Sequence, residues 1–181
     1  MTQTTCFEWD GQHMTDNPNR RRVVVTGLGV MSALGQTVDD YWDGLVSGKS
    51  GVAPLSLKGI EAYPCRIGAE VRDFDPTDFV DRKESRRLAR FAQFAVAAAA
   101  GALEDAGLPR LDGLNDEERS RVGVLLGTGI GGYPEIEAAC RVMIQRGGMR
   151  VSPYFTPMML PNMASANVSR IYGATGYMAP P

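Results

Sequence analysis

The feature that most constrains the fold is a long, alanine-rich helical stripe between Asp81 and Gly107. Asp81 and Glu84 have the spacing of a capping box, and Gly107 followed by Pro109 forms a stop signal. Because alanine lets neighbouring backbones approach closely, the stripe predicts one long helix that packs centrally on a sheet. Its apolar side chains recur at steps of three and four residues, at Leu88, Phe91, Ala92, Ala95, Val96, Ala99, Ala102, Leu103 and Ala106.

Shorter apolar runs on either side of this helix predict the remaining elements. The β-branched run Val23–Thr26 and the run Arg121–Gly127 are typical of buried strands. The alternation of such strands with helices indicates an α/β fold with a mostly parallel sheet flanked by helices. Periodicity and punctuation further predict helices at 38–46, 134–145 and 161–172, a short strand at 66–71, a loop at 48–64 and an irregular segment at 152–160.

Length and composition exclude several classes of protein. The 181 residues fit one domain, with a leader at 1–21 that we expect to be disordered and a folded part at 22–181. The formal net charge of −2 argues against a nucleic-acid partner. The most apolar segment, around 94–103, is too short to cross a membrane, and the N-terminus lacks an export signal. Three scattered cysteines fit a cytoplasmic protein without a metal site.

The glycine-rich segment Gly127–Gly132 formally matches the G-x-G-x-x-G pattern of dinucleotide-binding turns. That function also requires an acidic residue near the end of the next strand, where it holds the ribose. The stretch 147–162 contains no Asp or Glu. We therefore favour a turn that allows close backbone packing and expect no cofactor, with a nicotinamide-dependent oxidoreductase as the weaker alternative.

Catalytic residues are scarce in this sequence. Nucleophilic catalysis requires a nucleophile and a base within hydrogen-bond reach. The only histidine, His13, lies in the expected leader, so no Cys–His or Ser–His pair can form in the folded part. Cys65 and Cys140 are most simply interpreted as small buried or partly buried side chains. The residues themselves therefore predict neither a catalytic nor a metal-binding site.

Four cationic side chains gather within two helical turns at the start of the alanine-rich stripe. The simpler interpretation is a solvated helix face, which is what charge runs usually form. The alternative is a docking patch that attracts an acidic partner. The four residues are Lys83, Arg86, Arg87 and Arg90.

Several segments, in order and with family-like spacing from Arg22 to Gly176, resemble the β-ketoacyl-[acyl-carrier-protein] synthases of fatty-acid and polyketide synthesis. They include VVVTGLGVMSALG, YWDGLVSGKSGV, RVGVLLGTGIGG and RVSPYFTPMMLPNMASANVSRIYGATG. The chain looks most like the elongating synthase II of bacteria. This resemblance implies a thiolase-like fold with two pseudo-symmetric α/β halves, assembled as a homodimer. It also implies decarboxylative Claisen condensation of acyl and malonyl thioesters carried by acyl carrier protein.

The resemblance also implies roles for particular residues. Ile130 matches a position that lines the acyl pocket, and Phe155 matches one that reaches toward that pocket across the dimer interface. The nucleophilic cysteine is expected beyond Pro181, followed by the catalytic histidines, so we expect an incomplete N-terminal domain that is inactive alone. The positions that match the family's docking surface for acyl carrier protein are Lys83, Arg86, Arg87 and, more weakly, Arg150.

The end of the chain departs from the family pattern. Where the family continues into an apolar strand that leads to the cysteine, this sequence reads Gly176-Tyr-Met-Ala-Pro-Pro181. Two prolines do not suit a central strand, so we expect the strand pattern to stop here. Two alternatives to a fatty-acid synthase fragment remain open, a noncatalytic carrier-protein-binding module and a fragment of a polyketide-type ketosynthase.

Overall fold

The structure is a computed structural model that describes residues 21–57, 59–108 and 110–179. The expected leader therefore lies outside the described residues, apart from Arg21. The helices are α1 (Val38–Val46), α2 (Arg82–Ser85), α3 (Arg90–Asp105), α4 (Asp116–Ser120), α5 (Tyr133–Arg146), α6 (Phe155–Met159) and α7 (Met163–Tyr172). The strands are β1 (Val52–Pro54), β2 (Ile67–Ala69), β3 (Val124–Leu125) and β4 (Met178–Ala179), with 3₁₀ turns at Ile60–Ala62, Pro76–Asp78 and Gly148–Arg150.

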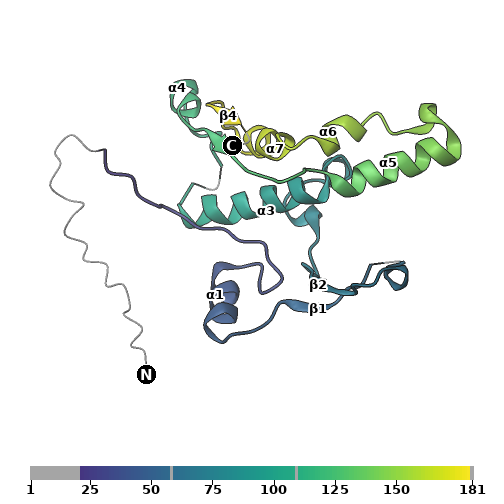
Figure 1. Ribbon diagram of the computed structural model, residues 1–181. Coiled ribbons are helices and arrows are strands. Elements are labelled where there is room, and N and C mark those ends of the chain that lie inside the picture. The colour runs from purple at the N-terminus through teal and green to yellow at the C-terminus, as the bar shows by residue number, and fades with distance from the viewer. Residues whose placement is uncertain (1–20, 58, 109, 180–181) are drawn as a thin grey trace.

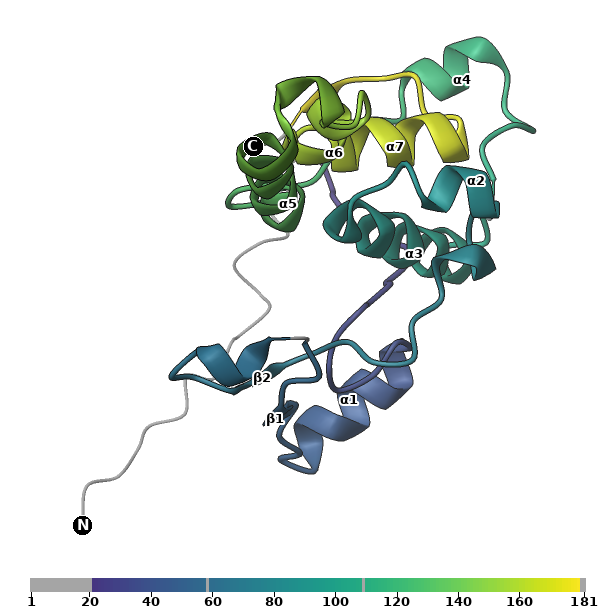
Figure 2. The ribbon, with the colours of Figure 1, turned by 90° about the vertical axis from the view of Figure 1, so that its right-hand side faces the viewer.

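Helix α3 forms the centre of the molecule. Figures 1 and 2 show α6 and α7 on one side of it and α1 with the β1–β2 ribbon on the other. The hydroxyl of Tyr172 on α7 donates to the carbonyl of Val96 on α3, at 3.0 Å, which ties the two helices together inside the core. The buried side chains of this core cluster are Leu88, Ala92, Val96, Val168 and Tyr172.

The single long helix predicted from Asp81 is wrong, because the chain breaks between α2 and α3. Asp81 caps α2 as expected, since its carboxylate accepts from the backbone N–H groups of Lys83 and Glu84 at 2.8 Å. Ala89 is extended, with ψ 156°, and starts α3 anew. The amide of Gln93 donates to the carbonyls of Ser85 and Leu88, at 2.9 and 3.2 Å, and so supports the broken backbone.

The run Val23–Thr26 is extended but is not a buried strand, and that prediction is wrong. Val23 is 91% exposed, and the run pairs with no strand among the described residues. The chain instead continues along α3, where a Cβ on Gly29 would overlap the carbonyl oxygen of Ala98. The close backbone approach expected of the alanine-rich helix is therefore confirmed, with the N-terminal segment as the neighbour.

The parallel pairing predicted for the sheet occurs between β3 and β4, with Val124 opposite Met178 and Leu125 opposite Ala179. The hydroxyl of Ser165, on α7, joins both strands, accepting from the N–H of Leu126 at 3.2 Å and donating to the carbonyl of Ala179 at 3.4 Å. The expected end of the strand pattern rested on the two terminal prolines, so the pairing of Met178 and Ala179 does not test it. The two prolines lie outside the described residues.

The run Arg121–Gly127 forms a strand only at Val124–Leu125, and Leu125 is 60% exposed, so its prediction as a buried strand is wrong in length and burial. Helix α4 was not predicted, and the elements below follow the sequence closely apart from two segments. Helix α1 has the predicted bounds, α5 carries Pro134 in its first turn, and α7 lies within the predicted range. The predicted loop at 48–64 contains β1, which pairs antiparallel with β2, and the irregular segment at 152–160 contains α6. Among the described residues, no helix combines the length and apolarity needed to cross a bilayer.

Candidate functional site

The basic cluster formed by Lys83, Arg86 and Arg87 lies on α2 and the turn that follows it. Lys83 and Arg86 are exposed, and Arg87 is half-buried. The guanidinium of Arg87 lies 4.9 Å from the centre of the Tyr154 ring, which is a cation–π contact. This contact fixes the orientation of the Arg87 guanidinium within the cluster.

The Arg87–Tyr154 contact also brings a distant segment to the cluster. Tyr154 follows Arg150 by four residues, and Arg150 is exposed at the end of a 3₁₀ turn. The segment that carries Arg150 therefore meets the turn after α2. Three of the four residues matched to carrier docking lie on α2 or directly after it, and Arg150 lies four residues before Tyr154, which touches Arg87.

The two acidic residues at the start of α2 both have hydrogen-bond or ion-pair partners. Backbone hydrogen bonds from Glu84 and Lys83 hold the pKa of Asp81 below its ordinary value, so this carboxylate stays ionised as a helix cap. The side chain of Glu84 forms an ion pair with Arg170 of α7 instead of closing a capping box. The exposed cations of the cluster thus face solvent.

Sequence reasoning missed Tyr154, which touches Arg87 of the cluster, and Arg170, which pairs with Glu84 on α2. Arg170 follows Glu84 by 86 positions, and nothing in the local pattern of either residue indicates the pair. Tyr154 is one of six tyrosines and stands out only once Arg87 is seen over its ring. Both contacts depend on how α7 and the segment before α6 pack, so no sequence signal could have found them.

The two residues matched to the acyl pocket do not meet in this structure. Phe155, at the start of α6, is half-buried and lines an apolar cavity of about 210 Å³ between α5 and α6. Ile130, in the loop between β3 and α5, is 59% exposed and does not line that cavity. Their assignment to one acyl pocket stays a prediction.

The glycine-rich turn before α5 packs closely against the end of α6. A Cβ on Gly131 or Gly132 would overlap backbone atoms of the segment 158–161, and Gly131 has φ +83°. The N–H of Gly132 donates to the carbonyl of Met159 at 3.1 Å. The packing interpretation is confirmed.

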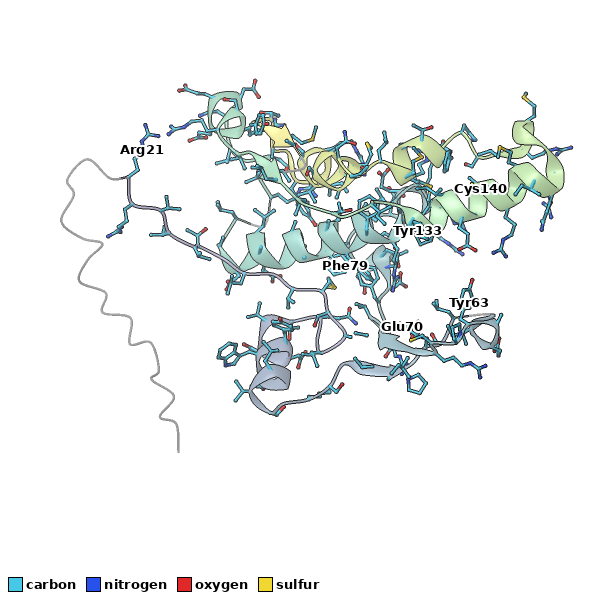
Figure 3. All side chains as sticks on the ribbon, viewed as in Figure 1. Arg21, Tyr63, Glu70, Phe79, Tyr133 and Cys140 are labelled. Atoms are coloured by element: carbon cyan, nitrogen blue, oxygen red, sulfur yellow. The ribbon has the colours of Figure 1, made fainter. Side chains whose placement is uncertain are left out.

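The cysteines differ from the sequence expectation. Cys65 and Cys140 are both free and exposed, so their interpretation as buried side chains is wrong. Cys140 lies on α5 (Figure 3), most of whose side chains are solvent-facing, and Cys65 lies in the loop before β2. His13 lies outside the described residues, and the described part of the chain contains no group of three or more potential metal ligands.

Comparison with known proteins defines the class of this chain. Its fold matches a solved structure described as the ishigamide ketosynthase/chain length factor, with a TM-score of 0.73 and 27% identity over 89% of this chain and 40% of that one. The α/β arrangement is therefore that of the N-terminal part of a thiolase-like ketosynthase. Residues 20–180 match the family model described as beta-ketoacyl synthase, N-terminal domain. The chain belongs to the β-ketoacyl synthase family.

Two relatives narrow the comparison. The 3-oxoacyl-[acyl-carrier-protein] synthase 2 of Synechocystis sp. is 43% identical over 160 residues, which cover 88% of this chain and 38% of that protein. The enzyme of the same name from Coxiella burnetii is 45% identical over 157 residues, which cover 87% of this chain and 37% of that protein. The chain thus spans less than two fifths of the length of these relatives.

Proposed function

We propose that this chain is the N-terminal region of a cytoplasmic 3-oxoacyl-[acyl-carrier-protein] synthase of fatty-acid biosynthesis. The observation that carries the proposal is the 43–45% identity to two synthases of that name along almost the whole chain. The reaction would be decarboxylative Claisen condensation between an acyl group held on a cysteine and malonyl-carrier protein. As in the family, the working form would be a homodimer.

The residues of this chain would supply binding surfaces, and the chemistry would come from elsewhere in the protein. Condensation needs an activated thiolate with imidazole partners. Neither exposed cysteine has a histidine partner available in the described part, because the only histidine of the sequence is His13. The expected nucleophile lies beyond Pro181. We therefore expect no condensing activity from these 181 residues alone.

The role proposed for the basic cluster is docking of the acidic carrier protein through Lys83, Arg86, Arg87 and Arg150. Lys83, Arg86 and Arg150 are exposed, and the half-buried Arg87 has its guanidinium over the Tyr154 ring. These features support a second candidate function, a noncatalytic carrier-binding module, because the whole cluster lies within this chain. The two functions share the docking step and differ in activity.

A titration of labelled bacterial acyl carrier protein with the purified chain tests docking. Two charge reversals, Arg86→Glu with Arg87→Glu, should weaken binding about tenfold or more, since each replaces an attraction by a repulsion. Salt should weaken wild-type binding, because the charges are exposed and screened.

The matched control is Lys49→Glu with Arg121→Glu, which changes the net charge equally at exposed sites outside the cluster. The control should bind like the wild type. A wild-type titration that stays flat at low salt would contradict docking in either candidate function. Condensation of malonyl and acyl units by the isolated chain would contradict the proposed division of labour.

A further inference from the structure

The acidic residue Glu84 lies inside the proposed docking surface, where its carboxylate would lower the net positive charge. Glu84 follows Lys83 directly and precedes Arg87 by three residues. The N–H of Arg87 donates to the carbonyl of Glu84 at 2.8 Å, so the two residues are one helical turn apart. At that spacing, a free Glu84 carboxylate would pair with Arg87 and cancel its charge.

Arg170, on α7, keeps the Glu84 carboxylate from pairing with Arg87. Its guanidinium pairs with the carboxylate of Glu84, whose side chain is 23% exposed. Arg87 instead places its guanidinium over the Tyr154 ring. Glu84 and Arg87 therefore have separate partners, although they are neighbours on the same turn.

The structure holds Arg170 in place for this contact. Its guanidinium also donates to the side-chain oxygen of Asn167, one turn earlier on α7, at 3.3 Å. Asn167 is buried and donates to the carbonyl of Met163 at 2.7 Å. Because Asn167 is fixed on a core helix, Arg170 reaches Glu84 from an anchored position.

We propose that Arg170 is a positioning residue for carrier docking. It holds the Glu84 carboxylate away from Arg87, so that Asp81, which acts on Lys83 and Arg87, is not joined by a second carboxylate in offsetting the positive charge presented to an acidic carrier protein. The inference rests on the proposed docking function and adds a residue that acts through Glu84. It requires no contact between Arg170 and the carrier.

The test compares carrier affinities at low salt for the intact chain and three variants. Arg170→Gln should weaken binding about two- to fivefold, the size expected from one partly exposed charge. Glu84→Gln should bind as tightly as the wild type or more tightly. The double variant, Arg170→Gln with Glu84→Gln, should return to the affinity of Glu84→Gln, because both variants lack the Glu84 carboxylate and keep the same Asp81.

The rescue by the double variant separates this role from two others. If Arg170 contacts the carrier itself, the double variant stays weak and the inference is overturned. If Arg170 only supports the fold, Arg170→Gln lowers the thermal stability and the folded fraction without changing the affinity of the folded protein, which also overturns it. Arg170→Lys, which keeps the charge, should keep the affinity.

The wild-type titration distinguishes a failure of the role proposed for Arg170 from a failure of the docking function. Wild-type binding that Arg170→Gln leaves unchanged overturns the inference and leaves the docking function standing. No wild-type binding overturns both. A salt dependence that becomes less steep in Arg170→Gln, and recovers in the double variant, is the further result expected when the effective charge of the surface changes.

Discussion

At the scale of single residues, Tyr172 carries the most informative contact of the core. Its ring is buried between α3 and α7, and its hydroxyl donates to the carbonyl of Val96. Burial raises the pKa of the Tyr172 phenol above its ordinary value, and the nearby Arg110 opposes this only in part. The folded state therefore holds the phenol in its neutral form.

Tyr172→Phe should lower the free energy of unfolding by about 1 kcal/mol near neutral pH, because the core loses one hydrogen bond. Since the folded pKa is raised, the contribution of the phenol is fully present below the unfolded pKa, near 10.0, and is lost as pH rises through the folded pKa. The stability difference between the two proteins should therefore shrink at alkaline pH. Urea unfolding at several pH values measures this.

Tyr63→Phe is the control for the alkaline effect, because Tyr63 is an exposed tyrosine on the other side of α3. It should leave the unfolding free energy unchanged. Equal stability of Tyr172→Phe and the wild type at neutral pH would show that the hydroxyl contributes nothing to the packing of α3 against α7.

At the scale of elements, the break between α2 and α3 decides where the basic cluster points. A continuous helix would carry Arg86 and Arg87 along the axis of α3. The break lets α2 turn, and Gln93 supports it by donating to the carbonyls of Ser85 and Leu88. One amide side chain therefore helps to fix the direction of a candidate binding surface.

Gln93→Ala should lower the free energy of unfolding by about 1–2 kcal/mol, because two backbone carbonyls lose a donor, even though alanine is the better helix former. Amide hydrogen exchange should speed up locally at 86–89. Gln145→Ala, at an exposed site on α5, is the matched control and should change neither quantity. Unchanged exchange at 86–89 would mean that Gln93 does not support the break.

At the scale of the whole molecule, the described part is layered around α3 (Figure 2). Several large apolar side chains remain exposed. Val23 and Val25 are 91% and 79% exposed, in an extended run that has no strand partner among the described residues. An exposed apolar run with strand propensity and without a strand partner can pair with another chain. The whole molecule therefore carries a surface suited to association.

We expect the isolated chain to self-associate with rising concentration, as measured by sedimentation velocity. Val23→Lys with Val25→Lys should shift it toward the monomer, because charge on an edge opposes pairing. Val46→Lys with Leu57→Lys changes two other exposed apolar residues and should leave self-association in place. A wild-type chain that stays monomeric at every concentration would contradict the expectation.

The sequence by itself determined several of the local elements and the family. The stripes at 38–46 and 134–145 predicted α1 and α5, because helical periodicity and caps are properties of neighbouring residues. The ordered family motifs predicted the ketosynthase fold that the comparisons show. Lys83, Arg86 and Arg87 could also be grouped from the sequence, because they are close neighbours that lie within two helical turns.

Only the tertiary structure decided which distant groups meet. The pair of Glu84 with Arg170, the contact of Arg87 with Tyr154 and the break before α3 all depend on packing across long stretches of chain. Val23–Thr26 has strand propensity but no strand partner among the described residues, and hydrogen-bond partners are a property of the assembled fold. Local propensity depends on neighbouring residues in the sequence. Charge pairing and strand pairing depend on the packing of the core, which brings distant segments together.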